Sequence, residues 1–167
     1  VILADGLGRV NTGNLILSKW ELKDAERYQL ALRGDQDELT KYFYLRRNVI
    51  KTKVNMPSAP FYAVNTHLTA FATDDTKLKH INGFKSILDG IVSDGKNFVA
   101  GGDLNELPPN ASKLDYCLED QCDNESYHTD KEPRHKEGAY FAPEITWLTD
   151  LYKTYKPAIS LEEYGAQ

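Results

Sequence analysis

The chain has 167 residues, of which 41% are hydrophobic and 27% are charged. This composition is typical of a globular protein, and the length suffices for a single domain, residues 1–167, with a hydrophobic core. The formal net charge of −5 disfavours a protein that binds nucleic acid through a broadly cationic surface, although a local basic patch can outweigh the total. No apolar run is long enough to span a membrane, and no signal peptide is visible.

The first part of the chain has the patterns of β-strands. Two short segments, residues 13–19 and 27–33, are expected to be strands because they are apolar or alternating and are bounded by turn residues. A longer alternating stretch covers residues 42–55, and residues 61–68 follow as a buried strand. The proline-rich sequence MPSAP separates the last two, so we expect them to pair as an antiparallel hairpin.

Helical spacing replaces the alternation after Asp74. The apolar positions recur every three or four residues, at Leu78, Ile81, Phe84, either Ile87 or Leu88, and Ile91. This spacing predicts a helix that begins with polar capping residues near Asp74 and ends at Gly95. Residues 97–103 follow as another buried strand. The resulting strand–helix–strand unit, together with the hairpin, indicates an α/β layered sandwich rather than an all-parallel sheet.

The remainder of the chain is less regular. Residues 111–118 are expected to form a helix, residues 119–138 a polar loop that could shape a pocket, and residues 145–155 a last short helix. Cys117 and Cys122 could pair with each other, but a single close pair is not a disulfide framework.

Two predicted strands end in polar side chains that a purely structural strand would not select. The first ends in Asn65, Thr66 and His67, and the second ends in the sequence GGDLN, with Asp103 and Asn105. In α/β sheets, ligands gather at the carboxyl ends of the strands. If the alternation continues through the sequence GGDLN, the side chains of Asp103 and Asn105 share one face. The two glycines before them allow a neighbouring backbone or a ligand to approach closely.

A carboxylate, an amide and an imidazole at one cleft suit the attack of water on a phosphoester. Asp103 can hold or deprotonate a water, Asn105 can donate to a charged oxygen, and His67 can donate a proton or a hydrogen bond. A metal ion would neutralise the developing charge. Each residue alone has a structural explanation, since Asp-x-Asn is common in turns and strand-end histidines are often structural. The hypothesis therefore depends on the combination.

Three segments in this order resemble the endonuclease/exonuclease/phosphatase superfamily. They are GNLILSKWEL at residues 13–22, FYAVNTHLTAF at residues 61–71 and FVAGGDLNELPP at residues 98–109, with a predicted helix between the last two. The superfamily includes pancreatic-type deoxyribonucleases, abasic-site endonucleases, neutral sphingomyelinases, inositol polyphosphate phosphatases and deadenylases. The resemblance covers most of residues 13–109 and is weaker after Asn110.

The resemblance implies a partial four-layer α/β sandwich, in which two packed β-sheets are flanked by helices, and phosphoester hydrolysis by in-line attack of water with Mg²⁺ as cofactor and Mn²⁺ as an alternative. By motif, Asp103 corresponds to the aspartate that positions or activates the water and could contact the metal. Asn105 corresponds to the residue that orients the water and stabilises the phosphate. His67 corresponds to the histidine that contacts a phosphate oxygen or assists the leaving group. Either Arg46 or Arg47 is expected to reach the phosphate.

Two further motifs of the superfamily do not match any part of this sequence. An asparagine and a Gln-Glu pair, whose glutamate is a principal Mg²⁺ ligand, are expected upstream of Gly13. A catalytic Asp-His pair is expected near the end of the domain, and the chain contains no Asp-His dipeptide. We therefore expect an internal piece of a longer protein with a partial active site. In isolation it should bind Mg²⁺ weakly and turn over little substrate or none.

The alternative from another class is a non-catalytic binding module that keeps the sandwich fold. The phosphoester substrate stays open among nucleic acid, phosphoinositide and sphingophospholipid, and the acidic balance leans toward a small or lipid phosphoester. No obligate protein partner is inferred. The four histidines lack zinc-ligand spacing with the two cysteines. Of these histidines, His80 lies in the predicted helix and is expected at the surface or at an interface.

Overall fold

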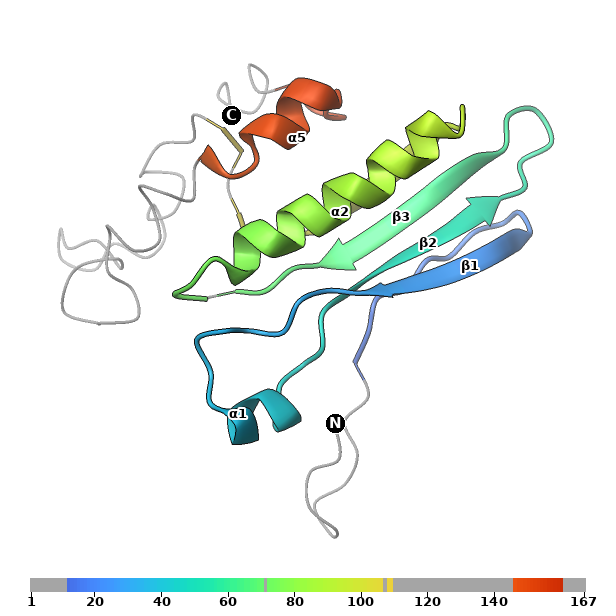
Figure 1. The fold of residues 1–167 in the computed structure, drawn as a ribbon. Coiled ribbons are helices and arrows are strands. Elements are labelled where there is room, and N and C mark those ends of the chain that lie inside the picture. Colours follow the sequence, from blue (N-terminus) through green and yellow to red (C-terminus); the bar gives the residue numbers. More distant parts are fainter. Residues whose placement is uncertain (1–11, 71, 107, 110–145, 161–167) are drawn as a thin grey trace, which may run out of the picture. The chain divides into compact units, whose positions relative to one another are not determined.

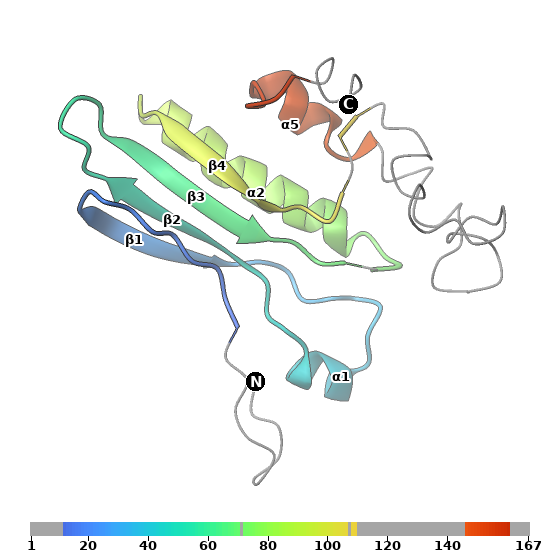
Figure 2. The same cartoon turned by 180° about the vertical axis from the view of Figure 1, so that it is seen from behind.

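The structure is a computed structural model that describes residues 12–70, 72–106, 108–109 and 146–160 (Figures 1 and 2). The chain divides into two compact units, Val1–Asn105 and Glu106–Gln167. The prediction of a single domain over residues 1–167 stays a prediction. No helix among the described residues is long and apolar enough to cross a membrane.

The first unit contains a mixed four-stranded sheet with the order β1-β2-β3-β4. Strand β1 (Leu22–Gln29) pairs antiparallel with β2 (Asn48–Val54), and β2 pairs antiparallel with β3 (Phe61–His67). Strand β4 (Phe98–Asp103) pairs parallel with β3. The mixed α/β class and the predicted β2–β3 hairpin are therefore confirmed.

The strand predicted at residues 13–19 was wrong, because this segment is irregular from residue 12 onward. It is held to the sheet by side-chain amides instead of a backbone ladder. Asn14 Nδ2 donates to the Asn48 carbonyl at 2.8 Å, and Asn65 Nδ2 donates to the Leu15 carbonyl at 3.0 Å. Two asparagines thus replace the regular hydrogen-bond pattern that the apolar sequence suggested.

Two further strand boundaries differ from the predictions. Strand β1 covers residues 22–29 rather than 27–33. The alternating stretch 42–55 becomes a strand only from Asn48, because the helical turn α1 (Glu38–Phe43) extends into its first residues. The Asp37 carboxylate caps that turn by accepting hydrogen bonds from two backbone N–H groups, and such a cap favours helix over strand locally.

The long helix α2 (Thr76–Ser93) confirms the helix predicted from the apolar spacing. It ends before Gly95, which has a φ of +68° that suits glycine. Helix α2 lies across one face of the sheet (Figures 1 and 2). The core consists of apolar side chains from the helix, the sheet and the segment after β3, among them Val49, Val64, Leu68, Ile81, Phe84, Leu88 and Ile91.

Strand β4 is not the buried strand that was predicted. Most of its residues are exposed, and the Val99 side chain is 65% exposed. Strand β4 lies at one edge of the described sheet. Register places Val99 beside Ala63 and Asp103 beside His67, so these residues share one face. The apolar sequence of β4 therefore indicated a strand correctly but overstated its burial.

The second unit contains the short helix α5 (Thr149–Thr154), which confirms the last short helix predicted within residues 145–155. Its neighbouring Leu148 and its own Leu151 are buried. The predictions for residues 111–118 and 119–138, and for the two cysteines, lie outside the described residues.

His80 was expected at the surface or at an interface, and the surface alternative is wrong, because its side chain is buried on α2. Its Nδ1 accepts a hydrogen bond from the Thr69 backbone N–H at 3.2 Å, and its Nε2 lies 2.7 Å from the Ala31 carbonyl oxygen. The carbonyl can only accept, so the ring is neutral with its proton on Nε2. His80 thereby joins the segments that follow β1 and β3.

We expect His80→Gln to flatten the dependence of stability on pH. Burial lowers the pKa of His80 in the folded chain. An unfolded histidine has a pKa of about 6.5, so below that pH the unfolded state binds a proton that the folded state resists. The stabilising contribution is therefore complete above about pH 6.5 and is lost as the pH falls toward the lowered folded pKa, by at most about 1.4 kcal/mol per pH unit.

Urea unfolding at a series of pH values between about 5 and 7.5 measures this slope. The control is Val92→Gln, which places the same amide side chain at an exposed, non-titrating position of the same helix. The control should keep the wild-type slope, whereas in His80→Gln the unfolded state should bind up to one proton fewer than in wild type. Parallel stability profiles for wild type and His80→Gln would contradict the assignment of His80 as a buried neutral group.

Candidate functional site

The parallel register of β3 and β4 brings two of the predicted site residues together. His67 and Asp103 are register partners at the carboxyl ends of their strands. His67 Nε2 lies 3.4 Å from Asp103 Oδ2, and the two side chains are 46% and 60% exposed. An imidazole and a carboxylate thus stand side by side at a solvent-accessible edge, where α/β proteins commonly bind ligands.

The third predicted residue, Asn105, reaches the same place by a turn. Strand β4 ends at Asp103, and Asn105 has a φ of +51°, so the expected alternation does not continue to it. Its backbone N–H donates to Asp103 Oδ1 at 2.9 Å, and its Nδ2 donates to the Leu68 carbonyl at 3.0 Å. Asparagine tolerates this left-handed conformation better than most residues. Asp103 is therefore oriented by Asn105 through Oδ1 and faces His67 with Oδ2.

The two glycines before Asp103 have different roles. Gly102 has a φ of +130°, and a Cβ atom there would overlap the backbone carbonyl oxygen of Thr66. At Gly101 a Cβ atom would meet nothing within 4 Å. The Gly-Gly sequence suggested that a neighbouring backbone or a ligand approaches closely. The structure shows such an approach at Gly102, and the neighbour is the backbone of β3.

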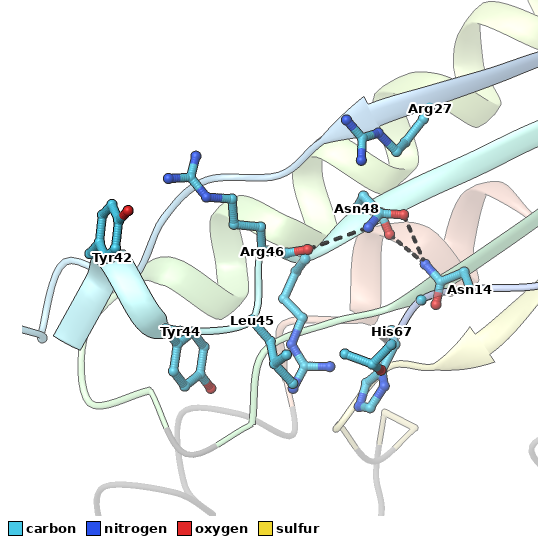
Figure 3. Close-up of a pocket in the computed structure, with 11 residues that line it drawn as sticks. Asn14, Arg27, Tyr42, Tyr44, Leu45, Arg46, Asn48 and His67 are labelled. Carbon is cyan, nitrogen blue, oxygen red and sulfur yellow. Dashed lines mark hydrogen bonds between the residues drawn. The ribbon is translucent and has the colours of Figure 1, made fainter. Parts of the chain in front are cut away.

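His67 also lines a pocket of about 290 Å³ (Figure 3). Its lining combines cationic, aromatic and amide side chains from the segment before β1, from α1 and the residues after it, and from strands β1, β2 and β3. The lining residues are Thr12, Gly13, Asn14, Arg27, Tyr42, Tyr44, Leu45, Arg46, Arg47, Asn48 and His67. No carboxylate is among these described residues, so the pocket favours an anion.

The pocket wall is fixed by hydrogen bonds between distant segments. Asn14 Nδ2 donates to both the backbone carbonyl and Oδ1 of Asn48, at 2.8 and 3.2 Å, as Figure 3 shows. Arg33 donates to Tyr44 Oη at 3.3 Å and forms an ion pair with Asp35. The hydrogen bond from Arg33 holds the pKa of Asp35 well below its usual range. This pairing keeps Arg33 engaged beside Tyr44, so it supports the wall.

Both arginines named as phosphate candidates, Arg46 and Arg47, line this pocket together with His67. Sequence reasoning missed Arg27, which lies on β1, and the amide pair of Asn14 and Asn48. The basic character of residues 41–53 was visible in the sequence. The approach of β1 and of the N-terminal segment to it depends on strand pairing, which no local pattern specifies.

The comparisons with known proteins assign no family to this chain. No protein-family model matches it, and no curated protein or solved structure is significantly similar to it. The resemblance to the endonuclease/exonuclease/phosphatase superfamily therefore rests on the sequence motifs, and the functional argument rests on the geometry of the site.

We expect Gly102→Ala to destabilise the chain by at least about 2 kcal/mol, because alanine would combine an unfavourable φ with an overlap against the Thr66 carbonyl. The control is Gly101→Ala, one residue earlier in the same strand, which should stay within about 1 kcal/mol of wild type. Chemical denaturation of both variants measures the difference. Equal stabilities would show that the approach of β3 and β4 at this point is not a constraint.

Proposed function

We propose that this chain carries part of the active site of a Mg²⁺-dependent phosphoester hydrolase. The observation that supports this most directly is the juxtaposition of His67 and Asp103 at the ends of two parallel strands, together with the carboxylate-free, arginine-containing lining of a pocket to which His67 also contributes. An acid–base pair next to an anion pocket is the arrangement that phosphoester hydrolysis requires.

In this proposal each residue has a role that follows from its contacts. Asp103 positions or deprotonates the attacking water, since its carboxylate is exposed and is held by the Asn105 N–H. Asn105 maintains the turn that presents this carboxylate, and its side-chain carbonyl can accept from the water. His67 donates a hydrogen bond to a phosphate oxygen or a proton to the leaving group.

The residues at the site supply the smallest number of carboxylate ligands, one, with which proteins bind a magnesium ion. Mg²⁺ binds through one or two carboxylates together with waters and substrate phosphate oxygens. Asp103 offers one exposed carboxylate, and the described residues contain no group of three His, Cys, Asp or Glu side chains that could hold a metal. In this proposal the metal would neutralise charge on the phosphate, and its main carboxylate ligand would come from the expected Gln-Glu motif.

We also propose that the sheet belongs to the two-sheet, four-layer sandwich of the superfamily. The face that carries His67 and Asp103 also carries exposed Val99. Leu15 and Leu17, in the segment joined to Asn65 of that face, are exposed too. A second sheet packed on this face would bury apolar surface, which is the main favourable term in layer formation.

The rival proposal is a non-catalytic module that uses the same pocket to bind an anion. The exposed His67–Asp103 pair favours hydrolysis, because the Asp103 carboxylate would repel an anion that is only bound, whereas hydrolysis needs a base near the attacking water. The two proposals differ in turnover, since a binding module retains its ligand without hydrolysing it.

We expect Asp103→Asn to lower the rate of phosphoester hydrolysis by about 10²- to 10⁴-fold while leaving the fold intact, because the amide cannot take a proton from water. The control is Asp75→Asn, since Asp75 has the same 60% side-chain exposure but pairs with Lys79 at the start of α2. The assay measures product release from bis-p-nitrophenyl phosphate, DNA, RNA, a phosphoinositide and sphingomyelin, with Mg²⁺ and with EDTA.

Both this chain and a version extended at both ends of its gene should be assayed, because the remaining motifs are expected outside the present sequence. Activity that EDTA abolishes and that Asp103→Asn removes would support the proposal. A folded extended protein without activity on any substrate, or an Asp103→Asn variant as fast as the Asp75→Asn control, would overturn it in favour of the binding module.

A further inference from the structure

The segment between β1 and β2 presents an unusual cluster of exposed apolar side chains. Helix α1 has no buried residue, and it projects from the β1 side of the sheet, away from α2 (Figures 1 and 2). Leu39 is 69% exposed and Tyr42 is 73% exposed, and Phe43 and Leu45 are exposed as well. We call these four residues the α1 apolar cluster. Such a cluster on one short segment is typical of a surface that contacts a partner or a membrane.

The α1 apolar cluster is continuous with the arginine-lined pocket. Tyr42 and Leu45 belong to the cluster and also line the pocket. In Figure 3, Tyr42 and Tyr44 lie on one side of the pocket and Asn14 and His67 on the other. A ligand that enters from the cluster side would thus pass from apolar side chains to His67.

The charges next to the cluster favour an anionic ligand. Among the described residues, neither Arg27 nor Arg46 has a hydrogen-bond or ion-pair partner for its guanidinium group. The carboxylates of α1 are already engaged, since Asp37 caps the helix and Glu38 pairs with Lys41 at 2.8 Å. Free guanidinium groups bind phosphate well because their geometry matches its oxygens.

We propose that the α1 apolar cluster docks on a lipid membrane and that the adjoining pocket receives the headgroup of an anionic phospholipid. Amphipathic segments bind the membrane interface by burying apolar side chains, and nearby arginines add electrostatic attraction to anionic lipids. The identification of this phospholipid as the substrate rests on the proposed hydrolase function, whereas the docking itself does not.

The observations favour this ligand over two others. A choline headgroup carries a quaternary ammonium, which three arginines would repel and which no lining carboxylate would balance. A nucleic-acid strand would need a cationic track along its backbone, and the net charge of −5 opposes a long one. The α1 apolar cluster is suited to the acyl chains of a phospholipid membrane, and the adjoining pocket is suited to the anionic headgroup.

Vesicle co-sedimentation of the full chain in EDTA tests the docking without requiring turnover. The vesicles contain phosphatidylcholine alone, or phosphatidylcholine with phosphatidylserine or with a phosphatidylinositol phosphate. We expect binding to both kinds of anionic vesicle, and weaker binding at high salt. Arg46→Gln should weaken binding to anionic vesicles about fivefold. The double variant Leu39→Ser/Tyr42→Ser should weaken it about tenfold or more.

The control is Val92→Ser, which removes an exposed apolar side chain from α2, and it should bind as wild type does. Circular dichroism and thermal melts establish that each variant is folded. Equal binding to vesicles with and without anionic lipid would overturn the proposal. So would a loss of binding in the Val92→Ser control as large as the loss in the Leu39→Ser/Tyr42→Ser variant. So would binding to a single-stranded oligonucleotide in place of vesicles. Because no metal is present, these outcomes are independent of whether the chain hydrolyses any phosphoester.

Discussion

The close approach of β3 and β4 at Gly102 is the constraint on which the candidate site depends. With no side chain at this position, the backbone of β4 can lie against the Thr66 carbonyl, and the parallel register can continue to the ends of both strands. That register places His67 beside Asp103. Two residues after Asp103, the Asn105 turn closes onto Leu68 and fixes the carboxylate. A shift of one residue would turn one of the two side chains to the face that α2 covers, because side chains alternate along a strand.

The sequence predicted well the elements whose patterns are local and strong. The apolar spacing of α2, its end at Gly95 and the strands around His67 and Asp103 all follow from periodicity and turn residues, which act over short distances. The pairing of these strands could also be anticipated from the strand–helix–strand order. Polar residues at the ends of two predicted strands were therefore sufficient to identify His67 and Asp103 as candidate residues of one site.

Two of the failures, at residues 13–19 and at His80, share a physical cause, which is that side-chain hydrogen bonds over long sequence distances replaced the local preference. Residues 13–19 were predicted to form a strand, yet side-chain hydrogen bonds of Asn14 and Asn65 join them to the sheet in place of a backbone ladder. His80 was expected at the surface or at an interface, yet the backbone of Thr69 and Ala31 provides hydrogen-bond partners for its ring inside the core. The burial of β4 was overestimated because an apolar sequence does not specify which layer covers it. None of these partners lies within one helical turn of the residue concerned.

The electrostatics of the site are likewise set by pairing rather than by composition. The chain is acidic in total, but near the pocket the carboxylates are engaged, Glu26 with Lys51 at 2.7 Å, Asp35 with Arg33 and Glu38 with Lys41. Exposed charges more than about 10 Å apart are largely screened at physiological salt, so distant unpaired carboxylates contribute little at the pocket. Arg27 and Arg46 are exposed and unpaired among the described residues, so they supply uncompensated positive charge to the lining of the pocket. A net charge of −5 is thus compatible with an anion pocket, because the relevant balance is that of the side chains within a few ångströms of the ligand.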